Sequence, residues 1–344
     1  MAKGILERLA DGPVLGDGGY LLELEKRGYV QAGPFTPEVV IEHPEALEQL
    51  HREFLRAGAE VLQTMTFYAS DDKLATVGMQ GKVDDINRNA VQIARRVAAE
   101  GDALVAGNLS LTWAYEPDDD ASADHVRRLL DRQLEDQTAA GGVDFWIGET
   151  FWNFGEALLC LERLKAKSKL PTMITLSFRA TNRLDDGVTA AEAARRLVDA
   201  GADIVGTNCM RDPERTYPIV AEMQAAVKND AFIAAQPVAF RTSQEVPWFT
   251  GTSAFPDKLE PIQLTRYEMG DFARRAKEMG IHYIGGCCGT VGSHIREMAK
   301  ALGKYQAEQV WQARPDAAMS ETEHNWARRG ARAPGQVERI PTSP

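Results

Sequence analysis

The sequence predicts an α/β protein of the (β/α)8 barrel class, in which eight parallel strands stand inside a ring of helices. Eight short, apolar, β-rich runs alternate with longer segments of helical periodicity. Glycine repeatedly ends a helical segment shortly before the next strand, which is its usual position at a helix C-terminus. Eight such alternations over roughly 250–300 residues are typical of the barrel. A doubly wound open sheet is the alternative architecture for the same alternation.

The predicted strands share one design, because each starts apolar and β-rich and several carry a polar or sulfur-containing residue at the far end. In a (β/α)8 barrel the loops at the carboxyl ends of the strands carry the chemistry. Those far ends are therefore the predicted active face. In chain order the predicted strands are Val14–Asp17, Val61–Phe67, Ala103–Ser110, Val143–Glu149, Thr172–Phe178, Asp203–Cys209, Phe232–Ala239 and His282–Cys287.

Helical patterns fill the intervals between these strands. Pro44–Leu55 repeats apolar residues at helical spacing, and so does Ala190–Val198, for which Thr189 and Glu192 predict a capping box at the start. Four junctions have the same form, a helix that stops at glycine one to three residues before a strand. They are Ala57-Gly58, Gly141-Gly142, Ala200-Gly201 and Met279-Gly280.

Length and charge limit the class of function. The chain has 344 residues, of which 44% are hydrophobic, enough to bury the core of one large α/β domain. A formal net charge of -11 without any basic run argues against binding to nucleic acid or to an anionic membrane, and favours a small-molecule substrate. No apolar stretch is long enough for a signal peptide or a membrane span, so we expect a cytoplasmic protein.

The predicted barrel occupies residues 1–303, and the composition changes after Gly303. The remaining residues, 304–344, are polar and irregular and are rich in proline, glycine and arginine towards the end. This segment predicts a C-terminal extension or oligomerisation arm that is partly disordered. Trp311 and Trp326 are apolar side chains in an otherwise polar tail, which favours a homo-oligomer, at least a dimer and up to a tetramer.

Three of the four cysteines form the most informative pattern. Cys209 ends one predicted strand, and Cys287 and Cys288 end another. Cys209 follows Gly201 by eight residues and Cys288 follows Gly280 by eight, so the sulfur atoms are expected at the same height on neighbouring loops. Four cysteines in a chain of this length do not make a disulfide scaffold.

Three thiolates suit Zn²⁺, and a zinc ion with three protein ligands keeps the open fourth position of a catalytic site. Adjacent residues of a regular strand face opposite ways. The backbone must therefore bend for Cys287 and Cys288 to reach one ion, and Gly285, Gly286 and Gly289 allow that bend. The alternatives are ordinary buried cysteines or a vicinal redox pair. Cys160 lies at helical spacing and is predicted to be core.

Two carboxylates are predicted to lie at the same face. Asp17 follows the first strand among glycines, and Glu149 ends the fourth. Together they could hold a substrate ammonium group, while the N–H groups of Gly18 and Gly19 could bind a carboxylate. Helix capping is the alternative role for both acidic residues. His282 and His294 flank the cysteine pair at a distance of six residues and are not expected to bind metal.

Aromatic residues gather in the predicted loops, where their faces could attract a methylated onium cation. Packing or lid formation is the alternative role of aromatic residues in loops. The cluster comprises Phe35, Phe67, Tyr68, Trp113, Tyr115, Phe151 and Trp152.

With these residues in place, the chain resembles the zinc-dependent homocysteine S-methyltransferases, and within them the branch that takes its methyl group from betaine. The resemblance runs from about Leu15 to about Ala301. It rests on Gly16-Asp-Gly-Gly19, Leu24-Glu-Lys-Arg-Gly-Tyr-Val30, Ala32-Gly-Pro-Phe-Thr-Pro-Glu38, Leu50-His-Arg-Glu-Phe-Leu-Arg-Ala-Gly58, Gln63-Thr-Met-Thr-Phe-Tyr-Ala-Ser70, Gly101-Asp-Ala-Leu-Val-Ala-Gly107 and Tyr283-Ile-Gly-Gly-Cys-Cys-Gly289.

The resemblance implies a role for each matching position. Cys209, Cys287 and Cys288 fall on the family's zinc ligands. Asp17 and Glu149 fall on the carboxylates that hold the homocysteine amino group. The amides of Gly18 and Gly19 then bind the amino-acid carboxylate, the aromatic donor pocket contains Phe35, Phe67 and Tyr68, and Gln63 and Thr64 lie just behind it.

The implied reaction is zinc-dependent transfer of a methyl group from an onium donor, first glycine betaine, to L-homocysteine, giving methionine and dimethylglycine. The sequence departs from the betaine enzymes at two positions. At Phe35, in the donor pocket, they typically have Trp, and at Thr150, next to Glu149, they typically have Tyr. That tyrosine can occupy the open zinc position.

Three other functions compete with this interpretation. The first is a homocysteine S-methyltransferase that uses a sulfonium donor, dimethylsulfoniopropionate or S-methylmethionine. The second is a cobalamin-dependent methionine synthase, which needs further cofactor-binding modules that 344 residues cannot hold. The third, from another class, is a non-catalytic zinc or redox sensor.

Overall fold

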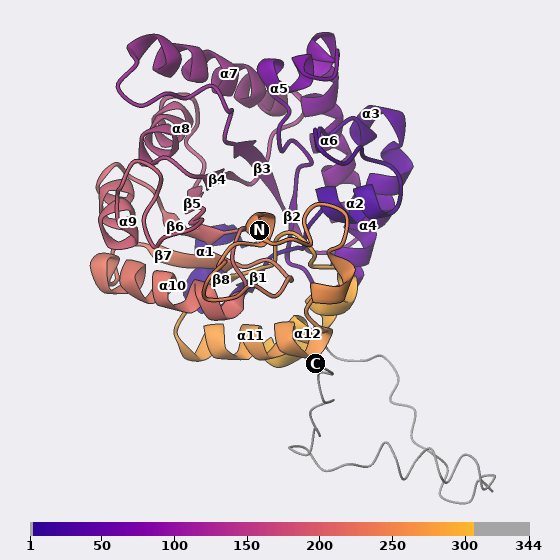
Figure 1. Ribbon diagram of the computed structural model, residues 1–344. Helices are drawn as coiled ribbons and strands as arrows, with labels where there is room; N and C mark the ends of the chain where they lie inside the picture. Colours follow the sequence, from indigo (N-terminus) through magenta and orange to yellow (C-terminus); the bar gives the residue numbers. More distant parts are fainter. Residues whose placement is uncertain (1–2, 306–344) are drawn as a thin grey trace, which may run out of the picture. The chain divides into compact units, whose positions relative to one another are not determined.

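The computed structural model describes residues 3–305, which form a nearly closed barrel of eight parallel strands surrounded by helices (Figure 1). The strand order is β1-β8-β7-β6-β5-β4-β3-β2, and every pairing between neighbours is parallel. This confirms the predicted fold class and excludes the open doubly wound sheet. The strands are β1 (Val14–Leu15), β2 (Val61–Gln63), β3 (Leu104–Ser110), β4 (Phe145–Phe151), β5 (Thr172–Leu176), β6 (Ile204–Asn208), β7 (Phe232–Gln236) and β8 (Tyr283–Ile284).

The gap between β1 and β2 is bridged by one residue. The Glu60 N–H donates to the Leu15 carbonyl at 2.8 Å, and the Leu15 N–H donates to the Glu60 carboxylate at 2.9 Å. These two hydrogen bonds continue the ladder at the point where the two short strands end.

The predicted strands are all present, but most are shorter than predicted at the carboxyl end. The ladder of β2 stops at Gln63 and that of β8 at Ile284, although the sequence remains apolar beyond both. The residues beyond the ladder are buried in loops that form the active face, so composition alone does not mark the end of pairing. β4 differs in the other direction and continues to Phe151, with a register shift against β5 between Gly148 and Phe151.

A helix or a short helical segment follows most strands and packs on the outside of the barrel (Figure 1). The α-helices are α1 (Ile5–Asp11), α2 (Leu21–Lys26), α3 (Val39–Glu42), α4 (Pro44–Ala57), α5 (Asp71–Ala75), α6 (Val83–Ala98), α7 (Asp120–Ala139), α8 (Phe154–Lys167), α9 (Ala190–Asp199), α10 (Pro213–Val227), α11 (Arg266–Glu278) and α12 (Gly292–Leu302), and three 3-10 turns are η1 (Gln80–Lys82), η2 (Phe249–Gly251) and η3 (Glu260–Ile262).

The predicted helix ends are confirmed in most details. Gly58, at the end of α4, has φ 109°, and Gly201 and Gly280 have φ 96° and 76°, the left-handed conformation in which glycine ends a helix. The capping box predicted for α9 is only half formed. The Thr189 side chain accepts from the Glu192 N–H, and the reverse bond from the backbone of Thr189 to the Glu192 side chain is absent from the described hydrogen bonds.

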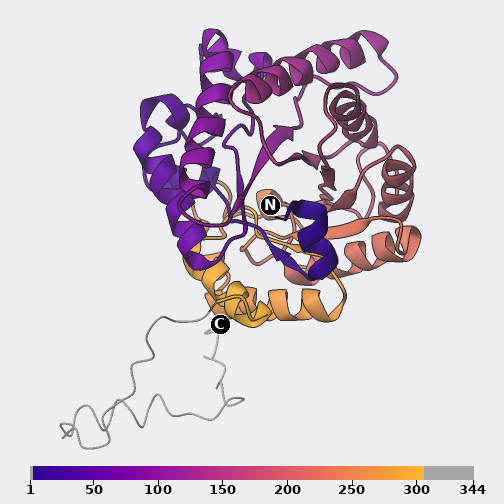
Figure 2. The same cartoon turned by 180° about the vertical axis from the view of Figure 1, so that it is seen from behind.

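The two ends of the barrel differ. At the amino end, Ile5 and Leu9 of α1 pack against Val14, Phe145 and other side chains from the beginnings of the strands, so α1 closes this end (Figure 2). The carboxyl end stays open to the loops. The polar residues at the strand ends are therefore left as the walls of a cavity.

The predicted C-terminal arm, residues 304–344, lies outside the described residues apart from Lys304 and Tyr305. Within residues 3–305, no helix is both long and apolar enough to cross a membrane.

Candidate metal and substrate site

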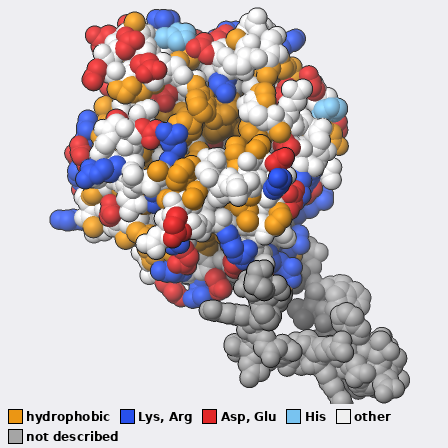
Figure 3. Space-filling model, in the orientation of Figure 1, with side chains coloured by type: hydrophobic (Ala, Val, Ile, Leu, Met, Phe, Trp, Pro, Cys, Tyr) orange, Lys and Arg blue, Asp and Glu red, His pale blue; other side chains and the backbone are white. Residues whose placement is uncertain are grey.

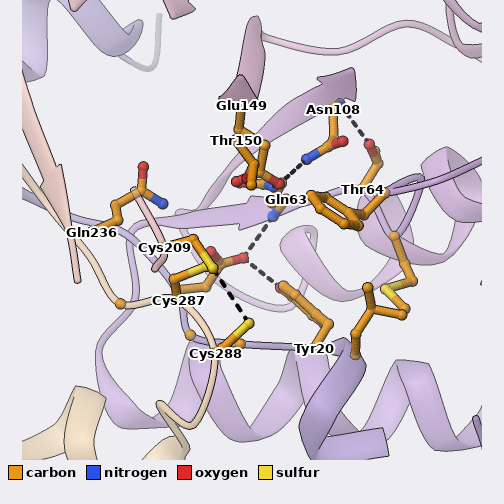
Figure 4. A pocket seen from close by; sticks show the side chains of 17 residues that line it. Tyr20, Gln63, Thr64, Asn108, Glu149, Thr150, Cys209, Gln236, Cys287 and Cys288 are labelled. Atoms are coloured by element: carbon orange, nitrogen blue, oxygen red, sulfur yellow. Dashed lines mark hydrogen bonds between the residues drawn. The ribbon is translucent and has the colours of Figure 1, made fainter. Parts of the chain in front are cut away.

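The three cysteines predicted to bind metal lie together at the carboxyl end of the barrel. Cys209 directly follows β6, and Cys287 and Cys288 lie in the loop after β8 (Figure 4). Their sulfur atoms lie within 4.8 Å of one another, and the sulfur atoms of Cys209 and Cys288 are 3.6 Å apart. Cys160 is completely buried in α8, as predicted for a core residue.

The predicted bend at the cysteine pair is a tight turn. The Thr290 N–H donates to the Cys287 carbonyl at 3.0 Å, and Gly289 has φ 80°. Glycine with positive φ at the third position is typical of a type II turn. On one side the Cys287 N–H donates to the Pro237 carbonyl, and on the other the Gly286 N–H donates to the Asp17 carbonyl. The loops after β1 and β7 therefore hold the cysteine turn from both sides.

The loop after β1 approaches this turn so closely that only glycine fits. A Cβ atom on Gly19 would lie 2.6 Å from the Cys287 carbonyl oxygen, and one on Gly18 would lie 2.5 Å from the Thr290 carbonyl oxygen. The structure also corrects one prediction, because the Gly19 N–H already donates to the Thr290 carbonyl at 2.9 Å. The Gly18 N–H has no acceptor in the described residues, so this amide alone is available to a ligand carboxylate.

The sulfur cluster fits a tetrahedral zinc ion. Zn–S bonds of about 2.3 Å place the sulfur ligands of a tetrahedral site about 3.8 Å apart, close to the separation of Cys209 and Cys288. Hydrogen bonding among the three thiols lowers the pKa of Cys209 and raises the pKa of Cys288.

A pocket that we call the inner chamber lies beside the cysteines and contains both predicted carboxylates. Asp17 is 2% exposed and Glu149 is 6% exposed, and neither caps a helix. The chamber is lined by Asp17, Gly18, Gly19, Tyr20, Leu21, Gln63, Thr64, Met65, Phe67, Asn108, Glu149, Thr150, Cys209, Gln236, Gly286, Cys287 and Cys288.

Both carboxylates are held by neutral donors. Asp17 accepts from the Gln63 N–H at 2.7 Å and from the Tyr20 hydroxyl. Glu149 accepts from the side-chain amides of Gln63, at 2.6 Å, and of Asn108 (Figure 4). It also accepts from the Asn208 side-chain amide at 2.9 Å. Gln63 thus binds one carboxylate through its backbone and the other through its side chain.

No Lys or Arg side chain lines the inner chamber, so burial raises the pKa of both acids, that of Asp17 to about 7 and that of Glu149 to about 8. A buried carboxylate without a counter-charge gains most from a ligand cation. The arrangement therefore suits an ammonium group.

Sequence reasoning missed three polar residues that line this chamber, Tyr20, Asn108 and Gln236, and also Asn208, which donates to Glu149. Asn208 and Gln236 end β6 and β7, and Asn108 lies within β3. The Gln236 side-chain oxygen is buried and has no partner in the described part of the chain. A polar residue at the carboxyl end of a buried strand was the signal available for Asn208 and Gln236.

A second pocket, the outer chamber, adjoins the first and has an aromatic wall. Phe35, Phe67 and Tyr68, the residues predicted for a donor pocket, lie on it, whereas Thr64 lies behind it in the inner chamber. Of the other predicted aromatics, Tyr115 and Phe151 are absent from the lining. The full lining is Leu21, Leu22, Gly33, Phe35, Phe67, Tyr68, Lys73, Trp113, Thr150, Trp152, Arg179, Cys209, Met210, Phe249, Thr250, Phe255 and Cys288.

Backbone strain is concentrated at this chamber. Six non-glycine residues of its lining have φ between 50° and 66°, a conformation that persists only where the surroundings enforce it and that is common at functional sites. They are Phe35, Tyr68, Trp113, Thr150, Cys209 and Met210.

Comparison with known proteins agrees with this geometry. The family model described as homocysteine S-methyltransferase matches residues 14–302. The chain belongs to the homocysteine S-methyltransferase family.

Relatives in this family differ in their methyl donor. The chain is 48% identical over 307 residues to betaine–homocysteine S-methyltransferase 1 of Danio rerio, covering 87% of this chain and 76% of the relative. It is 43% identical over 305 residues to the S-methylmethionine–homocysteine S-methyltransferase of Pongo abelii, covering 87% and 81%. The metallated homocysteine methyltransferase MmuM of Escherichia coli shares the fold, with a TM-score of 0.69, 22% identity and coverage of 86% and 99%.

Thr150 and Phe35, the two positions predicted to differ from the betaine enzymes, both line the outer chamber. The Thr150 N–H and hydroxyl both bond the Asn208 side chain, at 2.9 and 2.8 Å. Phe35 lies on the wall of the outer chamber against Phe255, with ring centroids 6.4 Å apart. His282 and His294 bond the backbone of Ile233 and of Val291, which agrees with the prediction that they are not metal ligands.

The geometry predicts one zinc per chain on the three cysteines. Cys209→Ala removes one of three sulfur ligands and is expected to lose bound zinc, whereas Cys160→Ala, a change of the same size in the core, keeps it. Zinc content of both purified variants, measured by plasma emission spectrometry, tests the assignment. Full zinc occupancy in the Cys209→Ala protein would contradict it.

Proposed function

We propose that this protein transfers a methyl group from an onium donor, first glycine betaine, to L-homocysteine, giving methionine and dimethylglycine. The observation that carries the proposal is the position of the sulfur cluster, which lines both a chamber with two buried carboxylates and a chamber with an aromatic wall. The first suits an amino acid and the second an onium cation. The names of the relatives support the same pairing of substrates.

Homocysteine binds in the inner chamber. Asp17 and Glu149 accept hydrogen bonds from its ammonium group, and the free Gly18 N–H donates to its carboxylate. Gln63, Asn108 and Asn208 keep Glu149 in place by their hydrogen bonds. The thiol of the substrate then points towards the cysteines.

Cys209, Cys287 and Cys288 are the residues that would hold Zn²⁺, which supplies the positive charge that removes the proton from a thiol at neutral pH. The proton leaves to solvent. The chain's own contribution is to place the sulfur of homocysteine and the methyl carbon of the donor in line, and this positioning accounts for much of the rate.

The donor binds in the outer chamber, where Phe35, Phe67 and Tyr68 surround its methylated onium centre. The sulfur of homocysteine forms a bond to one methyl carbon while the bond from that carbon to nitrogen breaks, and the electron pair stays on the amine. The negative charge of sulfur and the positive charge of the onium cancel, so an apolar wall favours the transition state over the separated charges.

Two alternatives predict different results. A sulfonium donor such as dimethylsulfoniopropionate or S-methylmethionine fits the same chemistry, and the relative from Pongo abelii supports it. A non-catalytic zinc or redox sensor leaves the paired carboxylates and the aromatic wall without a role. Assembly through the C-terminal arm stays a prediction.

The proposal predicts methionine formation from homocysteine and glycine betaine by the zinc-loaded protein. A panel of glycine betaine, dimethylsulfoniopropionate and S-methylmethionine, with methionine measured by mass spectrometry, tests it. Methionine from a sulfonium donor alone would reject betaine and keep the methyltransferase. No methionine from any donor would reject the function.

The buried pair of acids predicts a pH-dependent affinity for the amino-acid substrate. With a pKa of about 8, Glu149 is mostly protonated at pH 6 and must lose its proton to bind an ammonium, so affinity rises with pH between 6 and 8. L-Methionine, the proposed product, has no thiol that could lose a proton. The pH dependence of its binding therefore reports on the buried carboxylates. Glu149→Gln is expected to weaken its binding by about 2–4 kcal/mol and to flatten the pH dependence, with zinc retained.

Calorimetry with L-methionine at pH 6, 7 and 8 makes the measurement. Glu156→Gln is the matched control, since Glu156 is equally buried but bonds Thr112 and does not line the inner chamber. Equal affinities for the wild-type and Glu149→Gln proteins at all three pH values would contradict the assignment of Glu149.

A further inference from the structure

The two chambers are lined by ionisable side chains of opposite kind. The inner chamber is lined by Asp17 and Glu149 and by no basic side chain, while the outer chamber is lined by Lys73 and Arg179 and by no acidic side chain. They meet at the cysteines. In Figure 3, which faces the carboxyl end of the barrel, hydrophobic side chains gather around a hollow with basic side chains at its edge.

Within residues 3–305, Lys73 is a basic side chain of the outer chamber that forms no ion pair. It lies on α5 with its ammonium nitrogen 4.4 Å from the ring centroid of Tyr68 and 5.1 Å from that of Trp113. No carboxylate of residues 3–305 lies within ion-pair distance of it. Its two acidic neighbours are engaged elsewhere, Asp71 with Arg132 and Asp72 with His125.

Arg179 differs from Lys73 in this respect. Its guanidinium lies 4.4 Å from the ring centroid of Trp152 and forms an ion pair with Asp185. Burial lowers the pKa of Lys73, as expected for an ammonium that has lost water without gaining a counter-charge. The aromatic faces of Tyr68 and Trp113 compensate only part of that loss.

We propose that Lys73 binds the carboxylate of the methyl donor, and that the outer chamber therefore selects zwitterionic donors, in which one onium and one carboxylate leave no net charge. The inference rests on the proposed function. The apolar rings contact the methylated centre near the cysteines, and the ammonium of Lys73 receives the negative end of the same molecule. The donor completes the charge balance of the chamber.

This inference separates the two kinds of relative. Glycine betaine and dimethylsulfoniopropionate are neutral overall. S-Methylmethionine carries an ammonium and a carboxylate besides its sulfonium, so it has a net positive charge, and its ammonium would enter a chamber that is lined by Lys73 and by no acidic side chain. Like charges at short range in a partly buried site are unfavourable. The sequence identities to the betaine enzyme and to the S-methylmethionine enzyme, 48% and 43%, are too similar to identify the donor. The basis for choosing between the donors is therefore the charge of the outer chamber.

Two sulfonium probes test the role of Lys73. Dimethylsulfonioacetate and trimethylsulfonium both present a methylated sulfonium, but only the first has a carboxylate. For the wild-type zinc protein we expect kcat/KM with homocysteine to favour the first by about 10-fold or more. Lys73→Met, which keeps the apolar stem, is expected to remove this preference by raising the KM for dimethylsulfonioacetate, whereas the KM for the cationic trimethylsulfonium stays the same or falls because a like charge is removed.

Lys73→Arg keeps the charge and is expected to retain the preference, and Lys82→Met, a change at an exposed lysine that pairs with Asp85, leaves it unchanged. Lys73→Gln repeats the test if the methionine variant is unstable. An equal loss with both probes, or an unchanged preference in Lys73→Met, would overturn the inference while the methyltransferase assignment stands. A wild-type protein that methylates homocysteine from neither probe and from no donor of the panel above refutes the proposed function and, with it, this inference.

Discussion

The site depends on one close approach, that of the loop after β1 to the turn that carries Cys287 and Cys288. The two backbones exchange hydrogen bonds, since the Gly19 N–H donates to the Thr290 carbonyl and the Gly286 N–H donates to the Asp17 carbonyl. A side chain at Gly19 would place a carbon 2.6 Å from the Cys287 carbonyl oxygen, a contact that no packed structure accepts. The same contact that fixes the sulfur atoms also places Asp17 beside them.

This coupling explains why the predicted metal ligands and the two buried carboxylates occur together. Asp17 belongs to the loop that supports the cysteines, and Asn208, which bonds Glu149, directly precedes Cys209. A shift of either cysteine loop would therefore move a carboxylate or its donor. The two chambers follow the same principle, because acidic side chains line one and basic side chains line the other, and each proposed substrate would supply the opposite charge.

The sequence allowed the barrel and the three cysteines to be predicted, because both depend on patterns within single segments. Strand composition, helix-ending glycines and the position of a cysteine at a strand end are all local signals. Contacts between segments were not predictable in this way. The Gly19 N–H donates to the Thr290 carbonyl, and Lys73 lies against aromatic rings instead of a carboxylate. Both features depend on which loops meet in space. The ends of the strands were also misjudged, since burial continues beyond the last paired residue.

The central claim is that three cysteines leave one zinc position for the sulfur of homocysteine. Zinc X-ray absorption spectroscopy of the loaded protein, recorded with and without L-homocysteine, measures this directly. We expect three sulfur neighbours at about 2.3 Å and one lighter atom without homocysteine, and four sulfur neighbours with it. An unchanged number of sulfur neighbours after saturation with homocysteine would contradict the account.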